Sequence, residues 1–237
     1  MSKQQENLRV GLLVPSSNMT MEMDFHRELS ESFEIATARM HLPETTKEAE
    51  VEMIEKWLHL ANMDLNTVKP DITVFGCTSG GALFGQNHDR KIMRQIERET
   101  SSEAISILSA LSEEFALLNA KKLIVMTPYV QNLTDAVGQS LIEDGFDVLS
   151  IHGMGITDNL EIGRQGAVKI TEFVRANVGR ETIKNADCLF LSCTNLPAVS
   201  ALPELRSEFP EIPIMTSNLS VINAVKRRLG ETSPLKH

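Results

Sequence analysis

The chain has 237 residues, 42% of them hydrophobic and 23% charged, and a net charge of −9 at pH 7. This composition is typical of a globular protein with one large or two small domains, and it excludes collagen-like and low-complexity chains. The acidic balance and the lack of any block of lysine or arginine argue against nucleic acid as a partner.

Hydropathy argues against a membrane protein. The polar start of the chain lacks the apolar core of a secretory signal, and no apolar run approaches the ~20 residues that a transmembrane helix needs. The three cysteines, Cys77, Cys188 and Cys193, are too few for a disulfide framework and would stay reduced in the cytosol. We therefore expect a cytoplasmic protein that contacts no membrane.

Short β-branched runs alternate with longer amphipathic stretches from residue 9 onward. Prolines and glycines punctuate this alternation and mark the ends of several expected elements. The first part of the chain is expected to contain strands at 9–14, 33–40, 71–75 and 104–108, helices at 22–30, 46–62, 90–99 and 111–118, and a loop at 76–81.

The same order of elements then recurs. The second part of the chain is expected to contain strands at 122–126, 146–151, 187–192 and 213–215, and helices at 133–144, 159–177 and 220–229. Strands that alternate with helices of this length form parallel βαβ units with helices on both faces of the sheet. The predicted fold class is therefore α/β.

The recurrence predicts a duplicated domain. Pro15 and Pro128 each end the first strand of their part, and each is followed a little over sixty residues later by a cysteine directly after a buried-type strand. We expect two lobes, 1–105 and 106–217, with a C-terminal helix, 218–237, that packs back on the first lobe. Ligands of open α/β sheets bind at the carboxyl ends of the strands, which would place a site between the lobes. The alternative is that any βαβ chain resembles itself by construction.

Cys77 lies in a Gly-Cys-Thr-Ser-Gly-Gly loop. Such a loop offers backbone N–H groups, the hydroxyls of Thr78 and Ser79, and glycines that let a ligand approach closely. A helix that begins soon afterwards would favour the thiolate of Cys77. A small buried residue in a turn is the alternative interpretation, but the polarity of the loop favours a functional cysteine, with Thr78 and Ser79 as substrate ligands.

Cys193 occupies the matching place in the second part, where Thr194 is either a substrate ligand or a helix cap. Cys188 lies inside the preceding strand and is expected only to pack. Two opposed thiols suit a small carboxylate substrate, because one can act as nucleophile or base while the other moves protons at the opposite face. Hydroxyl and amide donors would hold the carboxylate oxygens.

Two strand-to-helix turns supply further candidate ligands. Ser16, Ser17 and Asn18 follow the first strand, and these residue types are also excellent N-caps. Tyr129, the single tyrosine of the chain, follows Pro128 in the matching turn. We also expect Asn159 to bind substrate, although capping of the helix at 159–177 would explain it equally well.

Metal and cofactor motifs are missing from the sequence. The six histidines are scattered without an HExxH-type pair, and neither a Walker loop nor a GxSxG motif occurs. Gly153 and Gly155 lack the third glycine of the dinucleotide fingerprint. We therefore expect no metal and no cofactor.

These motifs resemble the aspartate/glutamate racemase superfamily, and within it the branch of the maleate cis–trans isomerases and arylmalonate decarboxylases. The resemblance runs over most of the chain and is clearest in the opening Arg-Val-Gly-Leu-Leu-Val-Pro-Ser-Ser-Asn segment. It implies two flavodoxin-like lobes related by a pseudo-twofold axis, an active site in the cleft between them, and no cofactor. The residues that fall in order on the family's site motifs are Asn18, Cys77, Tyr129, Asn159 and Cys193.

By this resemblance, Cys77 adds to the double bond of maleate, the adduct rotates, and elimination gives fumarate, with Cys193 supplying and removing the proton. The Thr-Ser-Gly-Gly loop departs from the maleate isomerases and resembles that of arylmalonate decarboxylases, which lack the first cysteine. Superfamily members associated with ectoine utilisation are also similar. Isomerisation of a small dicarboxylate is the leading hypothesis. A two-cysteine racemase of an amino acid or related acid is the alternative, ahead of a decarboxylase and a non-catalytic binding protein.

An anionic substrate must enter a protein of net charge −9. Local donors, helix N-termini or an arginine must therefore outweigh the global field, which salt screens beyond about 8–10 Å. The candidate arginines are Arg9, Arg39, Arg90 and Arg164. The resemblance and the apolar helix faces favour a homo-oligomer, and a monomer core would explain those faces equally well.

Overall fold

The computed structural model describes residues 7–29, 31–44 and 46–230. The end of the predicted C-terminal helix, beyond residue 230, lies outside the described residues. Two four-stranded parallel sheets dominate the structure, with strand orders β2-β1-β3-β4 and β6-β5-β7-β8. Their strands are β1 (Leu8–Pro15), β2 (Phe33–Met40), β3 (Ile72–Phe75), β4 (Glu103–Ser106), β5 (Lys122–Tyr129), β6 (Asp147–Ile156), β7 (Cys188–Leu191) and β8 (Ile214–Thr216).

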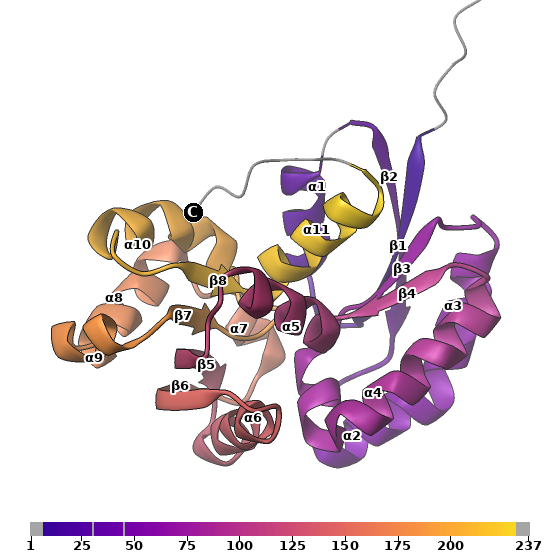
Figure 1. Ribbon diagram of the computed structural model, residues 1–237. Coiled ribbons are helices and arrows are strands. Elements are labelled where there is room, and N and C mark those ends of the chain that lie inside the picture. Colours follow the sequence, from indigo (N-terminus) through magenta and orange to yellow (C-terminus); the bar gives the residue numbers. More distant parts are fainter. Residues whose placement is uncertain (1–6, 30, 45, 231–237) are drawn as a thin grey trace, which may run out of the picture.

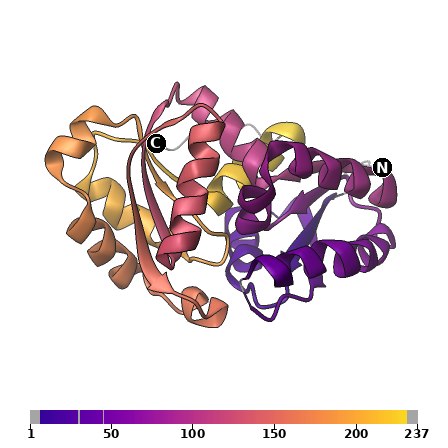
Figure 2. The same ribbon diagram turned by 90° about the horizontal axis from the view of Figure 1, so that it is seen from below.

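Helices cover both faces of the sheets, as Figures 1 and 2 show from two directions. The predicted α/β fold with two lobes is confirmed. The helices are α1 (Thr20–Glu28), α2 (Lys47–Glu52), α3 (Leu58–Asn66), α4 (Thr78–Thr100), α5 (Ile107–Leu117), α6 (Gln131–Glu143), α7 (Asn159–Gly163), α8 (Ala167–Asn177), α9 (Arg180–Asn185), α10 (Leu202–Glu208) and α11 (Ser217–Arg228), with a π-helical turn at Met53–Trp57 and a 3₁₀ turn at Ala198–Ala201.

Corresponding strands pair in the same register in the two sheets, as expected for a structural repeat. Leu13 of β1 pairs with Phe75, the last residue of β3, and Met126 of β5 pairs with Leu191, the last residue of β7. Cys77 and Cys193 therefore each lie two residues after the end of a strand, β3 and β7 respectively. Because the carboxyl ends of parallel strands share one edge, the repeat places both cysteines at the functional edge of their sheets.

β1 shows why these strands read as continuous apolar runs. Val10, Leu12 and Val14 point into a large core that also contains residues of α1, α5, α11 and the second sheet. Leu13 points to the opposite face, into a smaller core beneath the helices between β2 and β4. A parallel strand buried on both faces gains burial from every residue, so strict alternation of polar and apolar residues is lost.

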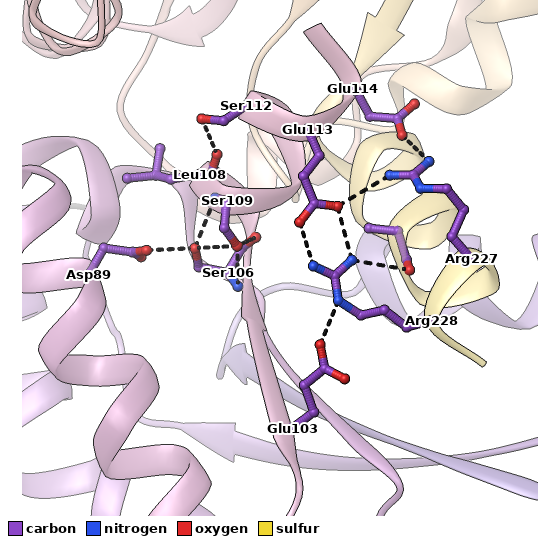
Figure 3. Close-up of polar contacts among 11 residues, drawn as sticks. Asp89, Glu103, Ser106, Leu108, Ser109, Ser112, Glu113, Glu114, Arg227 and Arg228 are labelled. Carbon is purple, nitrogen blue, oxygen red and sulfur yellow. Dashed lines mark hydrogen bonds and ion pairs between the residues drawn. The ribbon is translucent and has the colours of Figure 1, made fainter. Parts of the chain in front are cut away.

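The final helix, α11, joins the two halves. It follows β8 of the second sheet, lies beside α5 in Figure 1, and packs on α5 and α1. Two arginines of its last turn tie it down: Arg227 pairs with Glu114, and Arg228 bridges Glu113 and Glu103 (Figure 3). The exact boundary between the lobes, at residues 105 and 106, stays a prediction.

Two expected elements differ in the structure. The expected loop at 76–81 is wrong beyond residue 77, because α4 begins at Thr78 and continues through the glycines. Packing of this long helix against its neighbours overrides the weak helix propensity of glycine. The expected helix at 159–177 is wrong as one element, because it forms two helices, α7 and α8, separated by residues 164–166, which are not helical.

The break between α7 and α8 has a local cause. Arg164 ends α7, and Gly166 takes an extended conformation as the residue that precedes α8. The pattern also missed α9 and α10, which are short helices on either side of β7. Within the described residues, no helix is both long enough and apolar enough to cross a membrane.

Candidate active site

A small cavity lies where the carboxyl ends of the two sheets meet. Its volume is about 20 Å³, and both cysteines singled out from the sequence are on its wall. Residues from both halves of the chain therefore form one site. The lining residues are Pro15, Asn18, Leu42, Cys77, Thr78, Tyr129, Asn159, Cys193, Thr194 and Asn195.

Cys77 lies between the end of β3 and the first residue of α4, and it is buried. The turn before it needs a glycine, because a Cβ atom on Gly76 would lie 2.4 Å from Sδ of Met21 and 3.1 Å from the carbonyl oxygen of Leu13. This close approach lets β3 turn sharply into α4. Cys77 directly precedes the N-terminal end of the 23-residue helix α4, and the positive end of a helix dipole favours a thiolate.

Cys193 is held differently, in a turn rather than at the start of a long helix. Its backbone has a φ of 106°, and its N–H donates to Oγ of Ser217 over 3.1 Å. Burial raises the pKa of the Cys193 thiol, while the Tyr129 hydroxyl and the N–H groups of Asn195 and Leu196 donate to the sulfur and lower that pKa in part. The sulfur is therefore a thiol with a ready-made set of donors for its thiolate.

Tyr129 lies against both cysteines. Its side chain is buried, and its pKa is raised well above the usual value, mainly by burial and then by Cys193 and Cys77. The hydroxyl thus stays protonated and can act as a hydrogen-bond donor. Glu50 of α2 is fully buried, and its charge adds to the rise in the pKa of Tyr129 and of Cys193. The sequence pattern gave no signal for this carboxyl group.

Asn18 and Thr194 link the two halves across the site. The amide Nδ2 of Asn18 donates to Oγ1 of Thr194 over 2.9 Å, and that hydroxyl donates to the carbonyl oxygen of Gly76 over 3.1 Å. Oδ1 of Asn18 also accepts from the N–H of Met21 in the first turn of α1. Asn18 is therefore both a helix cap and a wall of the cavity.

Ser16 and Ser17 do not line the cavity that the structure describes. Both hydroxyls donate to the carbonyl oxygen of Leu42, and Oγ of Ser16 also accepts from the N–H of Leu42. Ser17 accepts from Nδ2 of Asn159 over 2.7 Å. The two serines therefore hold the segment after β2, which places Leu42 on the cavity wall.

Asn195 also lines the cavity, and its sequence position alone does not reveal this role. Its Oδ1 accepts from the N–H of Met19, its Nδ2 donates to the carbonyl oxygen of Asn159, and its own carbonyl oxygen accepts from Thr20. These contacts come from residues far apart in the chain, so only the fold reveals them. Thr78 lines the cavity and donates to Ser217, whereas the side chain of Ser79 lies outside the described residues.

No arginine or lysine is among the lining residues that the structure describes. Arg39 comes closest in function, because it donates to the carbonyl oxygens of Ser16 and Asn18 and so supports their turn from outside. Arg9 pairs with Glu34 in a separate hollow of about 500 Å³ at the amino ends of β1 and β2. Local amide, hydroxyl and backbone donors are therefore the groups available to an anion.

Within the described part of the chain, no group of three or more histidine, cysteine, aspartate or glutamate side chains is arranged to hold a metal ion. The donor set of the cavity consists of two sulfurs, amides, hydroxyls and N–H groups. Such a set can attack an unsaturated carbon, move a proton and bind carboxylate oxygens.

The chain is similar to known proteins over almost its whole length. The sequence profile of the arylmalonate decarboxylase family matches residues 10–235. A maleate isomerase from Geobacillus stearothermophilus is 26% identical over 239 residues, which cover 95% of this chain and 93% of that protein.

Two solved structures share the fold. The maleate cis–trans isomerase of Nocardia farcinica, in a variant with a covalently bound succinylcysteine intermediate, has a TM-score of 0.86 at 20% identity and covers 94% of this chain and 93% of its own. The maleate isomerase of Pseudomonas putida S16 has a TM-score of 0.86 at 22% identity, with the same coverage of 94% and 93%.

Proposed function

The chain belongs to the arylmalonate decarboxylase family, and we propose on this basis that it catalyses the cis–trans isomerisation of maleate to fumarate. The observation that carries the proposal is the meeting of two cysteines, one from each sheet, on one small cavity. Relatives named maleate isomerase, aligned over nearly the whole chain, support the choice of substrate.

The two cysteines have different electrostatic settings, and this difference assigns their proposed roles. Cys77 precedes a 23-residue helix, whose positive N-terminal end stabilises a thiolate. Burial raises the pKa of Cys193, so this residue holds its proton at neutral pH. Cys77 is therefore the proposed nucleophile, and Cys193 is the proposed proton donor.

The proposed reaction begins when Sγ of Cys77 attacks one alkene carbon of maleate and the electron pair of the double bond moves to the other carbon. That carbon takes the proton of Cys193, which leaves a succinyl thioether on Cys77 and a thiolate at Cys193. The thioether then rotates about its new carbon–carbon single bond. Finally the Cys193 thiolate removes a proton from the same carbon, the carbon–sulfur bond breaks, and fumarate leaves. Protons and electron pairs balance within the two sulfurs and the substrate, so the scheme needs no cofactor.

Amide and hydroxyl groups around the cavity are the proposed ligands of the carboxylates. Asn18 and Asn159 each have two amide hydrogens, of which the described contacts use one. The first backbone N–H groups of α4 add an anion-binding helix end. Tyr129 would hold the Cys193 thiolate after proton transfer, and Thr194 would keep the two cysteine turns aligned.

Two other reactions of the superfamily fit less well. Decarboxylation needs a single proton donor, so it leaves one of the two cysteines without a task. Racemisation uses both cysteines as bases, whereas the position of Cys77 before a long helix favours nucleophilic addition. The proposal therefore ranks isomerisation first.

Incubation of the protein with maleate, followed by NMR for fumarate, tests the proposal. Wild type should convert maleate, Cys77→Ser should not, and Cys193→Ser should accumulate a covalent adduct on Cys77 that mass spectrometry detects. Cys188→Ala is the matched control, because Cys188 is buried in β7 and burial raises its pKa to about 12. Failure to convert maleate, together with deuterium exchange into an amino acid, would instead assign a racemase.

The proposed enzyme is a cytoplasmic homo-oligomer. Exposed apolar side chains supply candidate contact surfaces, among them Met19 and Met23 near the start of α1 and Leu60 and Met63 on α3. Single apolar residues on a surface are common, so the groups rather than the individual residues support an interface. Light scattering of the purified protein measures the oligomeric state directly.

A further inference from the structure

Cys193 has a strained backbone. Four described non-glycine residues have a positive φ, and three of them, Lys69, Ser101 and Asn119, lie between 47° and 54°. Those values are close to the ordinary left-handed helical region, whereas the 106° of Cys193 lies outside it. Strain of this kind persists only where the surrounding structure over-determines the conformation, and it concentrates at functional sites.

The first turn of α11 holds this strained turn from both sides. Oγ of Ser217 accepts from the N–H of Cys193 over 3.1 Å, and Nδ2 of Asn218 donates to the carbonyl oxygen of Thr194 over 3.0 Å. The first contact holds the peptide N–H of Cys193 itself, and the second holds the carbonyl group of the next residue, Thr194. Two consecutive residues of one helix therefore hold the backbone turn that carries Cys193.

Asp24 of α1 fixes the orientation of Asn218. The amide Nδ2 of Asn218 also donates to Oδ2 of Asp24 over 2.7 Å, and both side chains are 1% exposed. The carboxylate of Asp24 and the carbonyl of Thr194 are acceptors only, so the nitrogen of the amide must face them. Oδ1 of Asn218 is buried and has no hydrogen-bond partner among the described residues, which is the cost of this orientation.

The ionised form of Asp24 is what selects this arrangement. Burial raises the pKa of Asp24 to about 6, so at neutral pH the carboxylate is charged in spite of its surroundings. A neutral partner at this position could donate to Oδ1 of Asn218 after a flip of the amide. The carbonyl oxygen of Thr194 would then lose the hydrogen bond that Nδ2 of Asn218 donates to it. The buried charge of Asp24 therefore costs stability, but it keeps Asn218 in the orientation that supports the turn of Cys193.

We propose that Asn218, oriented by Asp24, is a positioning residue that holds the strained turn of Cys193 in the geometry needed for proton transfer. This inference rests on the proposed function, because the proton acceptor is the adduct on Cys77. It assigns to α11 a role in the chemistry beyond joining the two halves. The reciprocal exchange of the two side chains separates this role from simple pairing.

The decisive variant is the double exchange Asp24→Asn with Asn218→Asp. It restores a buried amide–carboxylate pair, but a carboxylate at position 218 cannot donate to the carbonyl oxygen of Thr194. The single change Asp24→Asn keeps an amide at position 218 and so keeps a possible donor. Asn223→Ala is the matched control, because Asn223 lies on the same helix and donates to the buried Glu114 over 3.0 Å without touching the cysteine turn.

Two measurements are made on each variant. The first is kcat and KM on maleate, and the second is the rate at which iodoacetamide alkylates Cys193, read by peptide mass spectrometry. The exchange should lower kcat about 100-fold, the scale of a misplacement of about 1 Å, with KM within about threefold of wild type. It should also speed alkylation of Cys193 several-fold. Asp24→Asn alone should lower kcat by an intermediate factor, because the amide of Asn218 can then flip and leave the carbonyl oxygen of Thr194 without its donor in part of the molecules. Asn223→Ala should change neither measurement.

The proposal is overturned if the exchange variant folds and retains both the kcat and the alkylation rate of wild type. It is also overturned if Asn223→Ala reproduces the losses, because the effect would then belong to the stability of α11. If wild type does not convert maleate, the proposed function fails, and the alkylation rates still decide whether Asn218 holds the turn. Thermal unfolding of each variant identifies any that does not fold.

Discussion

Removal of one hydroxyl group, in the variant Tyr129→Phe, isolates the control of the Cys193 sulfur. The Tyr129 side chain is 3% exposed, and its hydroxyl donates to Cys193. Phenylalanine keeps the ring and its packing, so the change removes a donor and leaves the fold in place. Two N–H donors, from Asn195 and Leu196, stay on the sulfur.

The size of the effect follows from the charge of the thiolate. A hydrogen bond to a charged group contributes about 1.5–3 kcal/mol, and one pKa unit corresponds to about 1.4 kcal/mol. The pKa of Cys193 should therefore rise by about one to two units above its already raised value in the wild type. If the proton transfer to the adduct limits turnover, kcat should fall by about 10- to 100-fold.

Two assays check this prediction. The pH dependence of alkylation at Cys193 reports the titration of the thiol, and the conversion of maleate reports kcat. Thermal unfolding is the control, and the midpoint should stay close to that of wild type. If the pKa of Cys193 in Tyr129→Phe equals that of wild type, the reasoning is refuted. If kcat falls although this pKa is unchanged, Tyr129 acts on the substrate and not on Cys193.

Three further predictions concern stability. Gly76→Ala should lower the free energy of unfolding by about 1–3 kcal/mol in urea titrations, because the new Cβ meets Met21 at 2.4 Å, and Met21→Ala should cost less in this variant than in wild type. Arg227→Met should lower it by about 3 kcal/mol, because the carboxylate it pairs with has a side chain only 1% exposed, whereas Arg175→Met removes only surface pairs and should change it by less than about 1 kcal/mol. Burial raises the pKa of Asp24 from 3.8 to about 6, so the folded chain binds this proton more tightly and its stability should fall by about 3 kcal/mol as the pH rises from about 4 to 6, a fall that Asp24→Asn should abolish.

Each of these predictions has a contradicting outcome. A Gly76→Ala variant as stable as wild type would mean that β3 and α4 can shift apart. Equal losses in Arg227→Met and Arg175→Met would show that burial of the carboxylate does not matter. The carboxyl group of Asp24 also feels Arg27, which lowers its pKa, and Glu28, which raises it. If wild type and Asp24→Asn show the same dependence of stability on pH, groups other than Asp24 cause that dependence.

The parts of the structure that depend on local pattern could be predicted from the sequence. The alternation of strands and helices, and the place of Cys77 and Cys193 directly after buried strands, are visible because strand ends have local signals. The shared register of the two sheets then brings the matching positions to one edge. The sequence predicts a loop where α4 begins, because glycines favour loops locally. Packing of the long helix makes this segment helical in the structure.

The supports of the site could not be predicted in the same way. Asp24 and Asn218 are 194 residues apart in the chain, and Asn18 and Thr194 are 176 apart. No local pattern links such pairs, because each residue alone is an ordinary helix or cap residue. The positive φ of Cys193 is equally hidden, since a non-glycine residue gives no sign that the tertiary structure will force this conformation.

The cavity between the two sulfurs has a volume of about 20 Å³, enough for a single water molecule. A four-carbon diacid is several times larger than this cavity. The walls of the cavity must therefore part before such a substrate enters and close around it afterwards. In the proposed reaction, the carbanion formed by addition would meet amides and sulfur in place of bulk solvent once the walls close. The hydrogen that reaches carbon would then come from one buried thiol, and the rate at which solvent deuterium enters fumarate would measure how often the walls open.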